Sequence, residues 1–336
     1  MRRLFIATAL IFVCLGAGDS RADRKPMPYE DRVRIAEGRR MAAALGDRLW
    51  PGWQDAPFAV LLVTKQAEYL VYHPKPSDEF APLGFDSLLQ SEVYVRDRQF
   101  DPHLLATFPA VGGLPTITIG QPRNTDASHS TRWVITLLHE HFHQWQMSQP
   151  DYYRAVEALG LSDGDKSGMW MLDYPFPYDD KKIGEAFRRM CESLHDAVSG
   201  SGSQDYFADY FSARARFGGL LDEDDHRYFL FQIWQEGIAR YTEYMIARQA
   251  EVAYRPTDRF GELPDVTRFG EDAQETWGKV LNELRNMSLK KSRREAFYYV
   301  GAALGVLLDR ETPGWRDRYL EDKFSVEGYY PQSKGE

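Results

Sequence analysis

The spacing of hydrophobic and polar positions along this chain changes near residue 128. Before that point, short apolar runs rich in β-branched and aromatic residues lie between Pro, Gly and Asp, which predicts strands. The strands are expected at 58–64, 69–73, 91–97, 104–108 and 115–120. A helix is expected before them, because residues 29–50 carry apolar side chains at helical spacing.

After residue 128 the apolar positions recur almost entirely at helical spacing. Helices are expected at 130–147, 151–160, 180–199, 204–218, 223–250, 271–287 and 293–310. Residues 168–180 contain two prolines and several aromatic residues, which favours a structured loop. Strands followed by helices indicate an α+β fold, with a β-sheet in the N-terminal part and a mainly helical C-terminal part.

The first residues of the chain predict export. Two arginines precede an apolar run that ends at Gly16, and small residues follow, so residues 1–22 have the pattern of a cleavable signal peptide. No other stretch approaches the roughly 20 apolar residues that a membrane span needs. We therefore expect a secreted or periplasmic protein without stable membrane insertion. Cys14 suggests a lipid anchor as an alternative. The preceding Val13 argues against it, because a small residue is expected before a lipid-modified cysteine.

Composition narrows the class of protein further. Without residues 1–22 the only cysteine is Cys191, which excludes an intramolecular disulfide, so a hydrophobic core must provide stability. Residues 23–336 are long enough for one domain, with expected subdomains at 23–127 and 128–336. The net charge is −9, and loss of the signal peptide, with three arginines and one aspartate, leaves about −11. An acidic chain without a basic tract is not expected to bind nucleic acid. Its oligomeric state stays open.

The segment LLHEHFHQWQ, residues 137–146, predicts a metal site. His139 and His143 are four residues apart, so on a helix they share one face and both imidazoles can reach one ion. Glu140 lies beside them, which completes the H-E-x-x-H pattern of zinc hydrolases. We expect Zn²⁺ as the cofactor and Glu140 as the catalytic base. His141 faces elsewhere and is interpreted as a solvated or supporting residue.

A third zinc ligand must come from another segment, because catalytic zinc has three protein ligands and one open position. The segment WQEGIARYTEY, residues 234–244, presents Glu236 and Glu243 two turns apart on a predicted helix. Glycine is unfavourable inside a helix, so Gly237 suggests that a second helix approaches closely there. His226 is the alternative ligand. The candidates for stabilising an oxyanion are Tyr241, Tyr244, Tyr298 and Tyr299.

These residues together resemble the gluzincin group of zinc metallopeptidases, in which a later helix adds a glutamate in an E-G-x-A-x-Y context. The matching positions here are His139, Glu140 and His143, followed by Glu236, Gly237, Ala239 and Tyr241. The resemblance implies that His139, His143 and Glu236 bind zinc, that Glu140 is the base, and that Tyr241 is a catalytic candidate. It also implies a zincin-like fold with an N-terminal mixed sheet, and residues 115–120 as an edge strand that holds an extended peptide.

The sequence departs from that family at two points. Arg240 stands where many members carry an acid that orients a ligand histidine, so Glu243 or an acid from the 180–210 region must take this role. The aminopeptidase motif G-x-M-x-N is absent. We expect a metallopeptidase with a peptide or protein substrate. The alternatives are a zinc hydrolase with a non-peptide substrate and a non-catalytic scaffold with a structural zinc.

Overall fold

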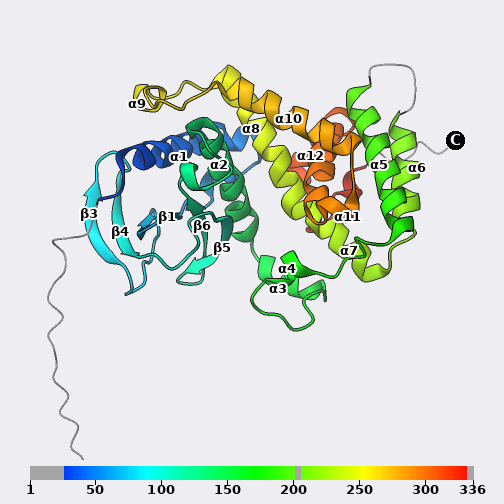
Figure 1. Ribbon diagram of the computed structural model, residues 1–336, viewed down its shortest axis with the longest axis horizontal. Helices are drawn as coiled ribbons and strands as arrows, with labels where there is room; N and C mark the ends of the chain where they lie inside the picture. The colour runs from blue at the N-terminus through cyan, green and yellow to red at the C-terminus, as the bar shows by residue number, and fades with distance from the viewer. Residues whose placement is uncertain (1–25, 201–205, 331–336) are drawn as a thin grey trace, which may run out of the picture.

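A computed structural model describes residues 26–200 and 206–330 (Figure 1). The predicted signal peptide, residues 1–22, lies outside these ranges. The described chain has an N-terminal six-stranded sheet followed by a mainly helical C-terminal part, which confirms the α+β prediction. Within the described ranges, no helix is both long and apolar enough to cross a membrane.

The sheet is mixed, and its order is β3-β4-β2-β1-β6-β5. The strands are β1 (Val60–Val63), β2 (Ala67–Val71), β3 (Ala81–Asp86), β4 (Ser91–Asp97), β5 (Leu105–Val111) and β6 (Leu114–Gly120). Only β1 and β6 pair in parallel, and the other neighbours are antiparallel. Strand β3 was not predicted, because Pro82 and Gly84 interrupt its alternation and most of its residues are exposed.

The edge of the sheet differs from the prediction. The 115–120 segment lies in β6, which is an internal strand between β1 and β5. Strand β5 is the edge on this side, because β6 pairs in parallel with β1 and antiparallel with β5 and therefore has no free side. The prediction of an edge strand at 115–120 was wrong, since pairing between distant strands cannot be read from the local pattern.

Two helices cover one face of the sheet, α1 (Tyr29–Leu49) and α2 (Ser130–Met147) (Figure 1). Alternate strand residues such as Val60, Leu62 and Val71 point to these helices and join the main hydrophobic core. The opposite face carries a small cluster of its own. Its buried members are Leu61, Leu70, Phe80 and Val111.

The C-terminal part is built of helices beside the sheet (Figure 1). The longer ones are α5 (Lys181–Ser199), α6 (Tyr206–Gly218), α7 (Glu223–Gln232), α8 (Ile238–Ala253), α10 (Phe269–Arg285) and α12 (Glu295–Glu311). Short helices are α3 (Tyr152–Ala158), α4 (Trp170–Asp173), α9 (Asp258–Gly261) and α11 (Leu289–Ser292). A 3₁₀ turn, η2 (Trp53–Asp55), lies in the N-terminal part between α1 and β1. Helix α4 lies in the predicted 168–180 loop. The predicted 223–250 helix is interrupted by a π-helical segment, η4 (Ile233–Gly237).

Helix α12 crosses the η4–α8 junction at two glycines. A Cβ atom added to Gly237 would lie 2.5 Å from the Cα of Gly301, so neither position accepts a side chain. This contact explains the unexpected Gly237 in a helical sequence, as the sequence analysis suggested. It also fixes the position of η4 against α12, next to the metal-site candidates.

Candidate metal centre

Helix α2 carries the H-E-x-x-H residues in a rotation that the sheet holds in place. The apolar band of the helix is buried, including Trp133, Leu138 and Phe142. The amide Nε2 of Gln144 donates hydrogen bonds of 2.9 Å to the carbonyl oxygens of Ala59 and Pro115. These contacts turn the 139/143 face of α2 away from the sheet and towards η4 and α8.

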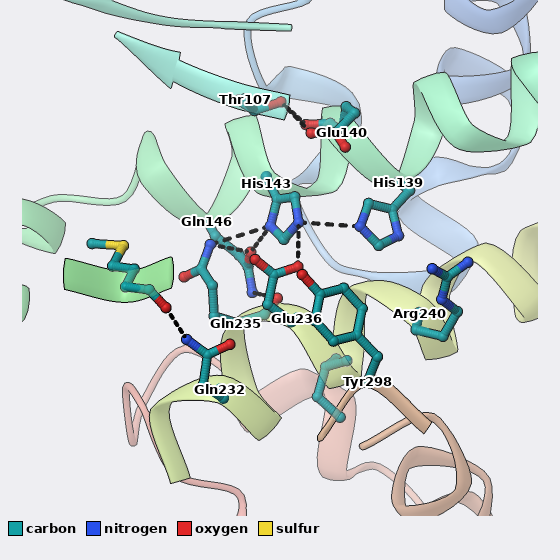
Figure 2. A network of polar contacts seen from close by, with 12 residues as sticks. Thr107, His139, Glu140, His143, Gln146, Gln232, Gln235, Glu236, Arg240 and Tyr298 are labelled. Carbon is teal, nitrogen blue, oxygen red and sulfur yellow. Dashed lines mark hydrogen bonds and ion pairs between the residues drawn. The ribbon is translucent and has the colours of Figure 1, made fainter. Parts of the chain in front are cut away.

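His139 and His143 converge through the same ring atom. Their Nε2 atoms are 3.2 Å apart, and both side chains are nearly buried (Figure 2). Oε2 of Glu236 lies 3.4 Å from Nε2 of His143. One ligand atom from each of the three residues lies within 4.8 Å of the others, so the group can hold a metal ion.

Glu236 reaches this position from the π-helical segment. The N–H of Ile238 bonds to the carbonyl of Ile233, five residues earlier, which is the π-helical spacing. Such single-turn bulges change the direction in which the following side chains point and recur at functional sites. The extra residue in this turn thus belongs to the local geometry that brings Glu236 beside His143.

Two of the three separations between the ligand atoms are those expected around a tetrahedrally bound metal ion such as zinc. Zinc–nitrogen bonds of about 2.0–2.1 Å in a tetrahedral arrangement separate two ligand atoms by about 3.3 Å. The two separations that involve His143 are 3.2 and 3.4 Å. Two imidazoles and one carboxylate are also a common donor set for zinc in hydrolases. His139, His143 and Glu236 therefore have the spacing and the chemistry of a three-ligand site.

The charges of the three residues are coupled. Burial lowers the pKa of His143, but the Glu236 and Glu140 carboxylates outweigh burial and raise this pKa to about 9. Burial raises the pKa of Glu236, yet the neighbouring His143 and Arg294 outweigh it and lower this pKa to about 2. In the metal-free protein the two side chains form an ion pair, and a metal ion must displace the proton from His143.

The carboxylate of Glu243 lies next to the second ring nitrogen of His139. Its Oε2 lies 3.2 Å from Nδ1 of His139, on the ring edge opposite the converging Nε2. Two arginines hold the same carboxylate: Arg132, and Arg240 at 2.6 and 2.8 Å. Burial raises the pKa of Glu243, but these two cations outweigh burial and keep it well below its usual range. Of the two expected sources of an acid beside a ligand histidine, the structure thus places Glu243 against His139.

The Nδ1 atom of His143 faces an uncharged side chain, Gln146, rather than a carboxylate. Its Nδ1 lies 2.8 Å from Oε1 of Gln146 and 3.1 Å from Nε2 of Gln235. Gln146 also donates to the carbonyl of Trp234 (3.1 Å) and to the hydroxyl of Tyr319 (2.8 Å). Gln146 therefore links helix α2 to the π-helical segment and fixes the orientation of the His143 ring.

Glu140 is anchored to the edge strand. The hydroxyl of Thr107 on β5 lies 2.9 Å from both the carbonyl oxygen and Oε2 of Glu140 (Figure 2). The side chain is 5 % exposed. Oε1 has no hydrogen-bond partner in the part of the chain that the structure describes. One carboxylate oxygen is therefore held in place while the other is available to a further molecule.

The side chains that border the site on the side of α12 are partly exposed. Tyr298 lies there next to Glu236 (Figure 2). Nη1 of Arg294 is 3.8 Å from Oε1 of Glu236 and contacts the Tyr298 hydroxyl. Arg294, Arg240 and Glu236 keep 23 %, 26 % and 18 % of their side chains exposed, whereas His139 and His143 keep less than a tenth. Burial and the Glu236 carboxylate hold the pKa of Tyr298 well above its usual range, so its hydroxyl stays protonated.

Other residues singled out in the sequence lie elsewhere. Tyr241 is fully buried, packs on Gly305 of α12, and its hydroxyl donates to Asp309 (2.5 Å). The described contacts do not bring Tyr241, the catalytic candidate, to the three ligands. Of the four tyrosines named as candidates, Tyr298 is the one that interacts with the ligand Glu236. Nε2 of His226 lies 3.1 Å from Nη2 of Arg214, and His226 is not one of the three ligands. Cys191 is buried in α5, which raises the pKa of its thiol.

His141 is not solvated, contrary to the expectation. It is 1 % exposed and its ring lies between Trp53 (5.5 Å between centroids) and Phe58 (4.6 Å) on the opposite side of α2 from the triad. Burial lowers the pKa of His141 to about 4 and outweighs the nearby carbonyls of Ala56 and Pro57. The imidazole is therefore neutral at physiological pH.

The supporting residues Thr107, Gln146, Arg132 and Arg294 were not predicted. Gln146 alone carried a local signal, because it follows His143 by three residues and so shares its face of the helix. Comparisons of the chain with known protein families, with curated proteins and with solved structures give no match.

Proposed function

We propose that this protein is a zinc-dependent hydrolase and that its substrates are peptides or proteins. The observation that carries the proposal is the position of Glu140: it is next to the ligand His139 in sequence, its charge raises the pKa of the ligand His143, and Thr107 holds its carboxylate. A purely structural zinc has no use for a fixed, proton-accepting carboxylate next to a site with only three protein ligands.

A zinc ion held by His139, His143 and Glu236 would polarise a substrate carbonyl and acidify a water molecule. The protein's own contribution is proton transfer and orientation. Glu140 accepts the proton of the attacking water and passes it to the leaving amine, as a general base and then a general acid. The hydrogen bond from Thr107 to Oε2 keeps this carboxylate in one orientation during both transfers.

Tyr298 and Arg294 supply hydrogen-bond donors on the α12 side of the site. Because the pKa of Tyr298 is raised, its hydroxyl remains a donor at neutral pH. The guanidinium of Arg294 contacts that hydroxyl and holds it next to Glu236. A donor in this place stabilises the negative charge that forms on the oxygen of a carbonyl under attack.

The free edge of β5 supports a peptide substrate. Thr107 belongs to this strand, so the edge strand passes next to the catalytic carboxylate. An extended peptide can add to such an edge through main-chain hydrogen bonds, which bind a backbone without regard to its sequence. The pattern of residues 1–22 further supports export, and we propose a secreted or periplasmic location.

The test combines metal content with activity. Glu140→Gln should retain about one zinc per chain by elemental analysis and lose cleavage of unfolded casein by about 10²–10⁴-fold. Glu157→Gln, an equivalent change at an exposed position of α3, serves as the control. Full activity in Glu140→Gln would refute the assignment of the base. A zinc-loaded wild type that cleaves no peptide bond would favour a structural zinc or a non-peptide substrate.

A further inference from the structure

A second site lies on the opposite side of helix α2 from the metal ligands. A cavity of about 760 Å³ opens there between α1, the η2 turn, the end of β2 and helix α9. Its volume lies within the range of small-molecule sites, about 300–1,000 Å³. None of the three metal ligands lines it, but His141, which is between them in sequence, does.

His141 brings two unused polar atoms to this cavity. The side chain is 1 % exposed, and neither Nδ1 nor Nε2 makes a hydrogen bond of good geometry among the described residues, although the carbonyls of Ala56 and Pro57 lie near the ring. An unpaired buried polar atom destabilises a protein unless something else satisfies it. The ring nitrogens of an imidazole can donate or accept a hydrogen bond, so His141 can bind a polar group at the inner end of the cavity.

The wall formed by Tyr72 is strained and held rigidly. Tyr72 and Gln90 both line the cavity and both have positive φ angles, 56° and 54°. Such conformations are unfavourable for residues with a side chain and persist only where the surroundings enforce them. The Tyr72 hydroxyl donates to the carbonyl of Leu89 (2.7 Å), and its ring packs against Phe58. This wall is therefore preformed in the protein without a ligand.

The mouth of the cavity carries two cations without a carboxylate partner. The guanidinium of Arg39 lies over the Tyr72 ring, 4.3 Å from its centroid, and neither Arg39 nor Arg259 forms an ion pair in the described part of the chain. The acids of the cavity are Glu37 and Asp258. Glu37 already accepts hydrogen bonds from Tyr254 and Thr257, and Arg40 lies 3.5 Å from it, so its charge is neutralised within the protein.

Apolar side chains cover the interior between these two polar ends. Val33, Ala36, Phe58 and Leu89 line it. A ligand that fits has an apolar body for this surface and an anionic group for Arg39 and Arg259. We propose that this cavity, here called the α1 cavity, binds a small amphipathic carboxylate, with its anionic group at Arg39 and its apolar body along Val33 and Phe58, so that a polar group at its far end would meet His141. This binding site is independent of the metal site and of the proposed hydrolysis.

Isothermal titration calorimetry with three probes that share an eight-carbon chain tests the proposal: octanoate, octanol and octylammonium. Octanoate should bind the full-length protein at one site with a Kd of about 1 mM or tighter, and octylammonium about tenfold or more weakly. Octanol should lie between them. The measurement does not involve zinc or catalysis, so its failure leaves the proposed hydrolase function intact.

Variants locate the binding. Arg39→Glu should weaken octanoate by about tenfold or more, while Arg48→Glu, the same change at an exposed position of the same helix, should leave it unchanged. Ala36→Trp fills the cavity and should abolish binding, with thermal melting to show that it folds. Failure of octanoate to bind the wild type would overturn the proposal. Equal affinity in Arg39→Glu, or tighter binding of octylammonium, would also overturn it.

Discussion

In the metal-free protein, the ion pair between His143 and Glu236 should make stability depend on pH in a defined window. The ordinary pKa of histidine, 6.5, applies to the unfolded chain, whereas the folded protein raises the pKa of His143 to about 9. The stabilisation from protonated His143 is thus fully present below pH 6.5. It is lost as the pH rises through 9, because above this pH the folded and unfolded states both hold a neutral imidazole.

The size of the effect follows from the two pKa values. A difference of about 2.5 pH units corresponds to about 3 kcal/mol of unfolding free energy. Other histidines do not obscure it, because the pKa values of His73, His141 and His226 are lowered and their effects fall at or below pH 6.5. The lowered pKa of Glu236 reflects the same ion pair and acts only in acid, between about 4.5 and 2.

Urea unfolding followed by tryptophan fluorescence measures this directly. With a chelator present, the unfolding free energy should fall by about 3 kcal/mol between pH 6.5 and pH 9. With zinc bound it should not fall, because zinc already keeps His143 neutral and higher pH favours metal binding. Glu236→Gln removes the main charge that raises the pKa of His143, so its metal-free form should show a much smaller change.

A flat pH profile for the metal-free wild type would refute this reasoning. It would mean that His143 is neutral at pH 7 even without metal and that the ion pair does not form in solution. An equal decrease in wild type and Glu236→Gln would also contradict it, because the decrease would then come from another group.

Three further predictions concern the structure around the site. Gly301→Ala places a methyl group against the Cα of Gly237 and should lower the unfolding free energy, measured in urea, by about 1–3 kcal/mol or more. The control Gly278→Ala, in an uncrowded position of α10, should be neutral or stabilising. Equal effects of the two changes would contradict the close helix contact. Glu243→Gln should weaken zinc binding by about 10–100-fold in competition with a chelating dye, because His139 loses its charged partner, and unchanged affinity would exclude this role. Thr107→Val should lower kcat without loss of zinc, as measured by turnover and elemental analysis, and an unchanged kcat would show that the hydroxyl does not orient Glu140.

The sequence by itself determined the elements with strong periodicity and the local metal motif. Helix α2 spans Ser130–Met147, as the pattern predicted, because its apolar band has a continuous helical period and Pro150 follows its end. The distance between His139 and His143 follows from the same period. Gly237 indicated a close helix contact for a physical reason that holds in any fold: only a residue without Cβ allows two backbones to approach so closely.

Only the tertiary structure decided which distant residues meet. Thr107 comes from the edge strand, Tyr298 and Arg294 from α12, and their places at the site depend on strand order and helix crossing. Strand β3 and the position of β6 inside the sheet also depend on pairing between segments far apart in the chain. Local propensity carries no information about such contacts, since their energy exists only once the segments have come together. The cavity that His141 lines together with Arg39 likewise exists only because distant segments pack against each other.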